Sequence, residues 1–350
     1  MPRFVSSIRG EKLTLVSIAV CVRNGKDWIN GCMESLVNQT YKTTEIILVD
    51  DGSTDGGREI VRKWASHDKV ITILQEAKGL SSGRMAALEI AKGDWFAITD
   101  IDVRPEANWI ESLLDSSVSR EGENVVAVTG RTVFGRSDDV ISKIRSIEIE
   151  SKYRSRPRRT KLANGPCSMF KTNELIEIGG FNPEWYHAED MEVSLKLIQA
   201  GGTIVYTPYA VVNHVPETGL TRFLNKRKRD ARAHVRIHRR YKGVRHDFIG
   251  SSWVVLWLIP LSILTTIGIF QYLTNLSGYS EIDTQSIYES LTREVLLILI
   301  LPLVWIGPFL KSNIPKKGLK AKFVLIAWSA VLWHGIILGY IDALLRRNGH

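Results

Sequence analysis

The sequence predicts an α/β protein whose doubly wound, mainly parallel sheet is followed by a C-terminal transmembrane helical region. Three observations predict this class. Apolar strand-like runs alternate with helical patterns over residues 13–102, a densely basic segment follows residue 219, and long apolar runs fill the remainder. A chain of 350 residues has room for one large domain and a second region.

The alternation begins with an apolar run at Leu13–Val22, in which we place the first strand at Leu13–Cys21. Basic residues precede this run as in a signal peptide, but no small-residue cleavage pattern follows it. Further strands are predicted at Glu45–Asp50, Val70–Leu74 and Trp95–Asp102, with helices at Asp27–Asn38, Arg58–Ser66 and Ser82–Ala91. Ser81 is the expected N-cap of the last helix.

Carboxylates follow two of these strands. The second strand ends in Asp50-Asp51-Gly52-Ser53-Thr54-Asp55, and the fourth ends in Asp100-Ile101-Asp102. Parallel strands bring their carboxyl ends to one edge, where open α/β sheets bind ligands. Asp100 and Asp102 would leave an extended chain on the same side and hold a divalent cation with phosphate oxygens. The first segment could equally be a helix-capping turn, with Ser53 or Asp55 as the cap.

Several classes are disfavoured. The chain lacks a Gly-x-Gly-x-x-Gly fingerprint and a Gly-Lys-Ser/Thr loop, which argues against an NAD enzyme and a P-loop ATPase. Cys21, Cys32 and Cys167 have no paired spacing, which indicates a reduced compartment and no structural zinc.

An ordered set of motifs carries a family resemblance. Val49–Asp55, Gly79–Arg84 with Ala86, and Asp100–Asp102 are followed by Gly165–Phe170, Gly179-Gly180-Phe181 and Glu189-Asp190. Over about residues 14–215 these motifs resemble the family 2 glycosyltransferases of GT-A fold (a Rossmann-like fold). The resemblance implies a UDP- or GDP-sugar donor and Mg²⁺ or Mn²⁺ as cofactor.

The resemblance also implies residue roles. Val22 and Asn24 at the end of the first strand would bind the nucleotide with Asp51, and Asp100 the ribose or the metal. Asp102 would hold the metal. Arg84, near a helix start, is a candidate phosphate contact, its alternative being a solvated helix charge.

Two later positions complete the predicted site. Asp190 would be the general base, with Glu189 beside it, although a residue at a helix start can also be an N-cap. His214 is a candidate metal ligand, and its alternative is an ordinary turn or surface residue. A single base with in-line attack implies inversion at the anomeric carbon.

Three apolar runs are candidate membrane spans, at residues 253–273, 295–310 and 323–341, each of which could instead be a buried core helix. Lysine and arginine counts place the large domain and the Lys311–Lys322 loop in the cytosol. Arg346 and Arg347 then fall outside, an exception that a re-entrant segment would remove. We therefore divide the chain into a catalytic domain (1–218), a basic interfacial helix (219–247) and a membrane region (248–350).

The chain has a net charge of +9, and Leu220–Arg245 is especially rich in lysine and arginine. Taken alone, such a run suggests nucleic-acid binding. Its place before a predicted span favours anionic lipid headgroups instead, with Leu220, Phe223 and Leu224 entering the interface. Processive relatives carry Gln-x-x-Arg-Trp here, whereas this chain has Lys226-Arg227-Lys228-Arg229-Asp230. The second basic stretch, Lys152–Lys161, is either a clamp for a lipid diphosphate or a solvated loop.

The sequence thus predicts a membrane-anchored, inverting, hexosyltransferase-like enzyme with a cytosolic catalytic domain. Because a hydroxyl must lose a proton and an ionised phosphate need not, a base favours a hydroxyl of a lipid-linked acceptor. The alternatives are a polyprenyl (dolichyl) phosphate glycosyltransferase, a processive polysaccharide synthase and an inactive nucleotide-sugar-binding scaffold. Oligomeric state is left open.

Overall fold

The computed structural model describes residues 14–154, 156–185, 187–241, 253–277, 318–345 and 347. The chain divides into two compact units. Unit 1 comprises Met1–Gly135, Tyr153–Val215 and Asn348–His350, and unit 2 comprises Arg136–Lys152 and Pro216–Arg347.

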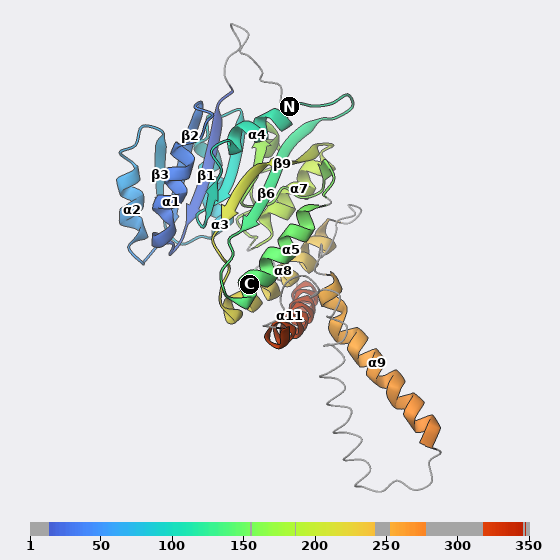
Figure 1. Cartoon of the computed structure of the whole chain (residues 1–350). Helices are drawn as coiled ribbons and strands as arrows, with labels where there is room; N and C mark the ends of the chain where they lie inside the picture. Colours follow the sequence, from blue (N-terminus) through green and yellow to red (C-terminus); the bar gives the residue numbers. More distant parts are fainter. Residues whose placement is uncertain are drawn as a thin grey trace. The chain divides into compact units, whose positions relative to one another are not determined.

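Unit 1 is built on one sheet with the strand order β3-β2-β1-β4-β8-β6-β9-β5, in which β7 also pairs with β9 (Figure 1). The strands are β1 Val16–Val22, β2 Thr44–Asp51, β3 Val70–Gln75, β4 Trp95–Asp100, β5 Val103–Pro105, β6 Val125–Phe134, β7 Arg159–Thr160, β8 Ser168–Lys171 and β9 Thr203–His214. β1 to β4 are parallel, and β8 is antiparallel to both β4 and β6. Because β8 runs antiparallel to both of its neighbours, β4 and β6 point the same way, and β9 is parallel to β6.

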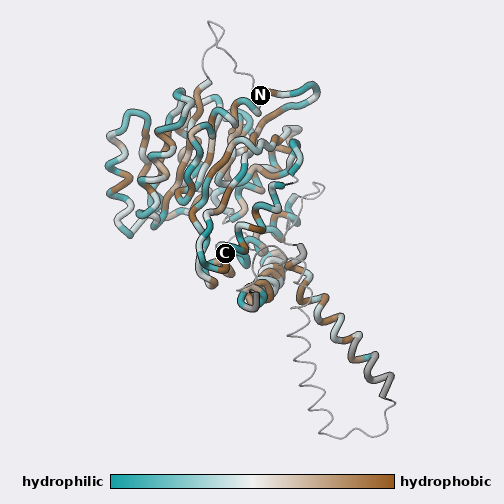
Figure 2. The backbone as a smooth tube through the Cα atoms, viewed as in Figure 1, coloured by the Kyte–Doolittle hydropathy of each residue, from teal (hydrophilic) through white to brown (hydrophobic). Residues whose placement is uncertain are grey.

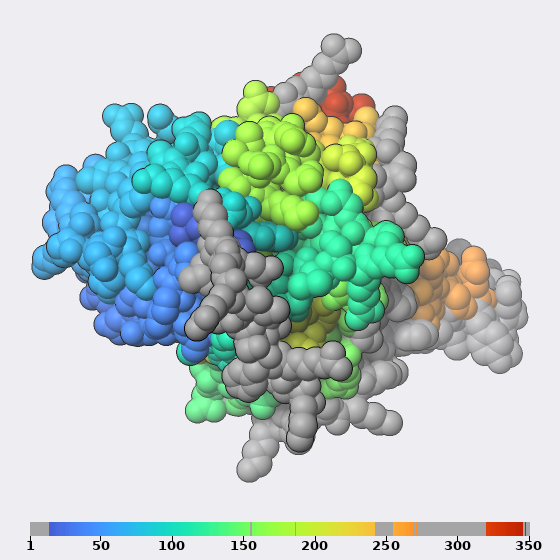
Figure 3. All heavy atoms as spheres, turned by 90° about the horizontal axis from the view of Figure 1, so that it is seen from above, coloured from blue at the N-terminus to red at the C-terminus, as the bar shows by residue number. Residues whose placement is uncertain are grey.

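Helices cover both faces of this sheet. One face packs α1 (Lys26–Val37), α2 (Gly57–Trp64) and α4 (Trp109–Ser116), and the other packs α3 (Leu80–Ile90), α6 (Thr172–Glu177) and α7 (Glu189–Gln199). Along β1, Ile18 and Val20 join the first apolar cluster while Ala19 joins the second, as alternating strand residues must. The yellow-green atoms of α6 and α7 adjoin the light-blue and cyan α3 region (Figure 3). The predicted doubly wound, mainly parallel sheet is confirmed.

The predicted strands and helices over residues 13–102 are present, with shifted ends. The N-cap residue of α2 is Gly56, but the Asp55 carboxylate accepts the N–H groups of Lys26 (3.0 Å) and Gly57 (2.9 Å), the first residues of α1 and α2. Ser81 as an N-cap was wrong. α3 begins at Leu80 after Gly79, whose φ of +96° suits glycine, and the Ser81 hydroxyl donates to the Trp185 carbonyl at 2.9 Å.

The placement of Asp102 was also wrong. β4 ends at Asp100, and Ile101 and Asp102 form a turn into β5. β5 leaves the line of β4 because it pairs antiparallel with β9, where Val103 lies opposite His214. The two carboxylates therefore do not project from one extended strand.

Unit 2 is helical, with α5 (Val140–Arg154, whose last two residues belong to unit 1), α8 (Leu220–Arg240), α9 (Trp253–Ser277) and α11 (Gly318–Leu344). Hydrophobic residues are frequent in the strands of unit 1 and in α9 and α11 (Figure 2). Within the described residues, one helix, 320–344, is long and apolar enough to cross a membrane, judged by length and composition, and 255–268 is a shorter apolar helix.

The predicted spans at 253–273 and 323–341 fall in α9 and α11, while 295–310 lies outside the described residues, as does 242–247 of the predicted basic helix. The expectation that Phe223 enters a membrane interface was wrong. Its side chain is fully buried and meets the Trp328 ring edge-on, with centroids 5.1 Å apart.

Candidate active site

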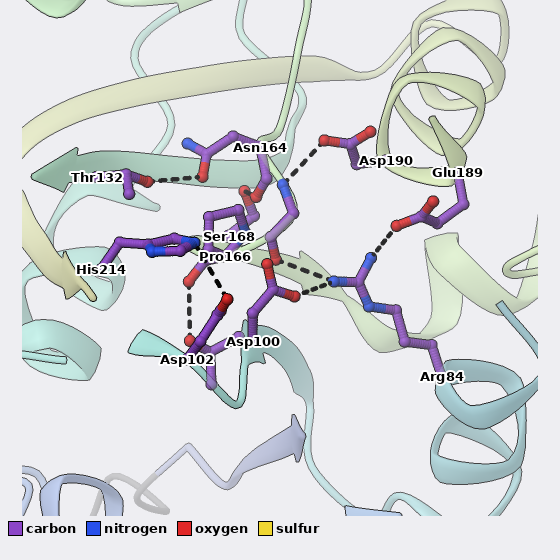
Figure 4. A network of polar contacts seen from close by, with 12 residues as sticks. Arg84, Asp100, Asp102, Thr132, Asn164, Pro166, Ser168, Glu189, Asp190 and His214 are labelled. Atoms are coloured by element: carbon purple, nitrogen blue, oxygen red, sulfur yellow. Dashed lines mark hydrogen bonds and ion pairs between the residues drawn. The ribbon is translucent and has the colours of Figure 1, made fainter. Parts of the chain in front are cut away.

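The polar site of unit 1 forms where the carboxyl ends of β4 and β9 meet the first turn of α7 (Figure 4). β4 supplies Asp100, the turn after it supplies Asp102, β9 ends at His214, and α7 begins with Glu189 and Asp190. Residues far apart in the sequence are adjacent here because β4, β6 and β9 run parallel and end at the same edge.

Arg84 links the strand side of this site to α7. Its guanidinium is buried in α3 and bonds Glu189 Oε1 through Nη1 (2.7 Å) and Asp100 Oδ1 through Nη2 (3.0 Å). Nη2 also donates to the Gly165 carbonyl at 3.3 Å. The predicted phosphate contact is not tested by this arrangement, but both terminal nitrogens already have protein partners.

Glu189 has an altered acidity. Burial raises the pKa of its carboxyl to about 7, and the charge of Asp190 adds to the rise while Arg84 opposes it. Near neutral pH, Glu189 therefore exists both as a neutral protonated acid and as a carboxylate that is ion-paired with Arg84.

Asp190 is held by backbone N–H groups. Oδ2 accepts the N–H of Gly165 at 2.9 Å, and Oδ1 accepts that of Met191 at 2.8 Å. The two residues before α7, His187 and Ala188, have φ values of +81° and +60°. Non-glycine residues pay a conformational cost in this region, of the kind that collects at functional sites.

Asp102 and His214 form the second pair of the site. His214 Nε2 lies 3.4 Å from Asp102 Oδ2, and Nδ1 lies 2.7 Å from the Val215 carbonyl. A carbonyl only accepts hydrogen bonds, so Nδ1 carries the proton and the Nε2 lone pair of a neutral ring faces the carboxylate. Phe134 stacks on the imidazole, with centroids 4.3 Å apart and planes 19° apart.

This pair fits a divalent cation. Two electron-rich atoms that face each other are held together by a proton or a metal ion between them, and carboxylate with imidazole is a common ligand set. Among the described residues no group of three or more His, Cys, Asp or Glu side chains could hold a metal. The remaining ligands would be water and diphosphate oxygens, as is usual for Mg²⁺ bound beside a nucleotide.

The residues predicted to bind the nucleotide lie at the ends of β1 and β2 and shape the loops there. Asp51, 3% exposed, accepts bonds from Gln75 Nε2 (2.7 Å) and from the N–H groups of Lys78 (2.8 Å) and Gly79 (2.9 Å). Asn24 accepts the Thr54 N–H at 2.8 Å, and Val22 is buried in the core. Their contact with a donor remains a prediction.

Sequence reasoning missed two supporting residues. Asn164 donates from Nδ2 to Thr129 Oγ1 (2.7 Å) and the Gly130 carbonyl (2.9 Å), which fixes the loop that presents Gly165 to Asp190. The motif beginning at Gly165 was a signal for this loop. Phe134 had no signal, because its place beside His214 follows from the β6–β9 register.

Two family descriptions match this sequence. Glycosyl transferase family 2 matches residues 17–178, and Glycosyl transferase family group 2 matches residues 123–342, which is more than half of the chain. This chain belongs to the family 2 glycosyltransferases. The family predicted from the short motifs is confirmed.

Several curated proteins match this chain over parts of their length. "Glycosyltransferase GlyA" of Streptococcus pneumoniae is 32% identical over 124 residues, which are 35% of this chain and 18% of the relative. The "Poly-beta-1,6-N-acetyl-D-glucosamine synthase" of Staphylococcus aureus is 25% identical over 219 residues, 60% of this chain and 52% of the relative. The chain thus spans about a fifth to a half of these curated relatives.

A solved structure shares the fold. The mannosyltransferase PcManGT from Pyrobaculum calidifontis, solved with GDP-Man and Mn²⁺, superposes with a TM-score of 0.54 and 19% identity. The match covers 95% of this chain and 88% of the mannosyltransferase. The GT-A fold predicted for this family 2 glycosyltransferase is confirmed.

Proposed function

We propose that this protein is an inverting glycosyltransferase that transfers a sugar from a UDP- or GDP-sugar to a hydroxyl of a membrane lipid-linked acceptor. One observation supports the proposal: the turn after β4, the end of β9 and the start of α7 contribute Asp102, His214 and Asp190 to one site, in which Arg84 pairs with Asp100 and Glu189. A donor-side cation site and a candidate base are thereby close to each other.

Asp102 and His214 would hold Mg²⁺ or Mn²⁺, with Asp100 beside them. When bound, such an ion neutralises the charge that develops on a departing nucleoside diphosphate. The Val215 carbonyl and the Phe134 ring fix the orientation of His214. The metal-bound PcManGT structure supports a divalent ion in this fold but does not identify the one used here.

Asp190 would take the proton from the attacking hydroxyl. The N–H groups of Gly165 and Met191 fix the rotamer of its carboxylate, so little reorganisation is needed before attack. Glu189 would position Arg84, because its carboxylate is buried and paired with that guanidinium. One base and one attack give inversion.

The lipid-linked acceptor is supported by unit 2. α9 and α11 are apolar, and α8 carries a dense set of cations that would attract anionic headgroups by about 1 kcal/mol each near the surface. A base is needed for a hydroxyl acceptor and not for an ionised polyprenyl phosphate, which favours the former. An integral membrane protein with a cytosolic catalytic domain follows from the lysine and arginine counts.

The test is release of UDP or GDP from a panel of nucleotide sugars with Mn²⁺ and membrane lipid extract, followed by mass spectrometry of the lipid product. Asp190→Asn should slow transfer about 10²- to 10⁴-fold and keep nucleotide binding. Asp102→Asn should weaken Mn²⁺-dependent donor binding in calorimetry. The exposed Asp115→Asn on α4 is the matched control and should change neither.

Three outcomes would redirect the assignment. Undiminished transfer by Asp190→Asn would favour a phosphate acceptor, and tight nucleotide binding without turnover would favour a scaffold. A ladder of products would favour a polysaccharide synthase, which the 25% identity to the poly-N-acetylglucosamine synthase supports. The missing Gln-x-x-Arg-Trp motif predicts a single added sugar instead.

A further inference from the structure

Two helices of unit 2, the basic α8 and the apolar α11, pack side by side and run in the same direction. Phe223 near the start of α8 meets Trp328, and Arg239 near its end lies over the Tyr340 ring at 5.9 Å. Between these contacts, Val235 lies beside Gly339. The contact therefore extends along most of α8.

The two backbones approach closely at glycines. A side chain at Gly335 would collide with the Lys228 carbonyl, and a Cβ at Gly339 would lie 2.7 Å from Val235 Cβ and 2.9 Å from the Arg232 carbonyl. Gly335 and Gly339 are four residues apart, the small-residue spacing that lets helices pack tightly. The glycines therefore allow α8 and α11 to form a tightly packed interface.

A charge pair closes the end of this interface. Arg232 bonds Asp342 through both Nε and Nη2, the latter at 2.7 Å from Oδ1. Asp342 is the only acidic residue in the described part of α11. It is 2% exposed, so its charge is buried between the two helices and paired with Arg232. The relative position of α8 and α11 is fixed by specific partners as well as by apolar packing.

The cations of α8 conflict with a spanning α11. The contact from Trp328 to Tyr340 covers about 20 Å of helix, and a bilayer core is about 30 Å thick. If α11 crossed, the middle of α8 would share its depth. That part of α8 holds Lys226, Arg227, Lys228, Arg229, Arg232 and Arg236. Arginine and lysine are among the residues least tolerated at the centre of a bilayer.

The face of α11 turned away from α8 is suited to a shallow position. Its exposed residues recur at helical spacing and include Phe323, Ala330, His334, Ile337 and Leu344. His334 lies near the middle of the helix, where a spanning segment would place it in hydrocarbon. An apolar stripe of this kind on one side of a cationic helix pair is typical of elements that lie in the membrane surface.

We propose that the α8–α11 pair lies in the plane of an anionic membrane surface, with the exposed apolar side chains of α11 at the boundary between headgroups and acyl chains, where His334 stays within reach of the headgroups, and with the exposed cations of α8 at the headgroups. α11 then does not span. The exposed cations include Arg222, Arg239 and Arg240. This inference rests on the proposed membrane association and is independent of the sugar-transfer chemistry.

α9 offers an internal reference for depth. The hydroxyls of Ser262, Thr265 and Thr266 each donate to the carbonyl four residues earlier, so these three polar groups are satisfied within the helix. Leu264, 63% exposed, is an apolar position on its outer surface. A helix of this kind is compatible with the hydrocarbon core.

The experiment uses the full chain in phosphatidylcholine–phosphatidylglycerol vesicles. Single cysteines replace Phe323, Ala330, Ile337 or Leu344 in a Cys21→Ser background, and each is labelled with a polarity-sensitive fluorophore. Lipids with nitroxides at shallow or deep acyl positions quench the label. Leu264→Cys on α9 is the deep control, and circular dichroism checks the fold of each variant.

We expect the four α11 labels to be quenched most by the shallow nitroxide, to similar extents, and Leu264→Cys by the deep one. The inference would be overturned by two results together. The labels at positions 330 and 337 would be quenched most by the deep nitroxide, and the cysteines at positions 323 and 344 would react with an impermeant maleimide from opposite sides of the membrane. Unchanged α11 depth when phosphatidylglycerol is omitted would overturn its headgroup part. Failure of the chain to enter vesicles at all would instead count against the proposed membrane function.

Discussion

Each unit of this protein contains an ion pair between an arginine and a buried carboxylate, with different results. In unit 1, Arg84 joins Asp100 and Glu189, and the Asp100 side chain remains 32% exposed beside Asp102. In unit 2, Arg232 joins Asp342, which is 2% exposed and lies inside a helix–helix contact.

The difference lies in what surrounds each pair. Strand ends bring several charges to one sheet edge, so the carboxylates of unit 1 gather at the candidate active site, where the Asp100 side chain stays partly exposed. Two helices bring one charge from each side, so the pair in unit 2 serves to fix their packing. The same chemical pair therefore organises the candidate active site in one unit and a helix–helix interface in the other.

The largest expected effect is at Arg84. Arg84→Met leaves Glu189 buried beside Asp190 without its cation, and we expect a loss of about 3–5 kcal/mol in the free energy of unfolding. Urea denaturation measures it. Arg62→Met, which breaks the exposed pair with Glu59, should cost at most about 1 kcal/mol. Equal effects of the two substitutions would contradict the role of Arg84.

The raised pKa of Glu189 makes the stability of unit 1 depend on pH. Its pKa is raised from 4.5 to about 7, so the folded state binds the proton more tightly than the unfolded state. This contribution to stability is complete below pH 4.5, falls as the pH rises towards 7 and is lost above it, amounting to about 3 kcal/mol at most.

Glu189→Gln removes that titration. The difference in unfolding free energy between the native chain and the variant should therefore decline from pH 4.5 to 7 and then level off. A difference that stays constant across this range would show that Glu189 titrates normally.

Breaking the pair in unit 2 should cost less, because the partly exposed Arg232 neutralises one carboxylate there, whereas the buried Arg84 neutralises two. Arg232→Met is expected to lower stability by about 1.5–3 kcal/mol, the range for hydrogen bonds to charged groups. Thermal melting in detergent micelles is the measurement, with the exposed Arg240→Met as control. A loss larger than that of Arg84→Met would reverse the comparison.

The smallest effect is expected at Trp333. Pro260 has no N–H, so the Leu256 carbonyl loses its usual partner in α9. Trp333 Nε1 (2.9 Å) and Ser329 Oγ (3.3 Å) of α11 donate to this carbonyl instead. Trp333→Phe should cost about 1 kcal/mol. If Pro260→Ala restores the helical bond, it should reduce that cost in the double variant.

The sequence predicted much of unit 1 and less of unit 2. Alternating apolar runs located β1 to β4 and the helices between them. Short motifs identified Asp102 and Asp190 as candidates, and the end of a later strand-like run identified His214. Ser81 and the strand position of Asp102 were misplaced because hydrogen bonds to distant residues, Trp185 and the β9 strand, decided the local backbone. Residues 295–310 lie outside the described part of the chain.

By itself, the sequence determined which polar side chains lie near the ends of strands and at the start of α7, because hydrophobic periodicity sets roughly where these elements stop. The tertiary structure decided which of them meet. Two antiparallel pairings of β8 return β9 to the direction of β4 and bring His214 to Asp102. Long-range packing likewise buried Arg84 between two carboxylates and set the cations of α8 beside α11, since such contacts depend on register that no local pattern encodes.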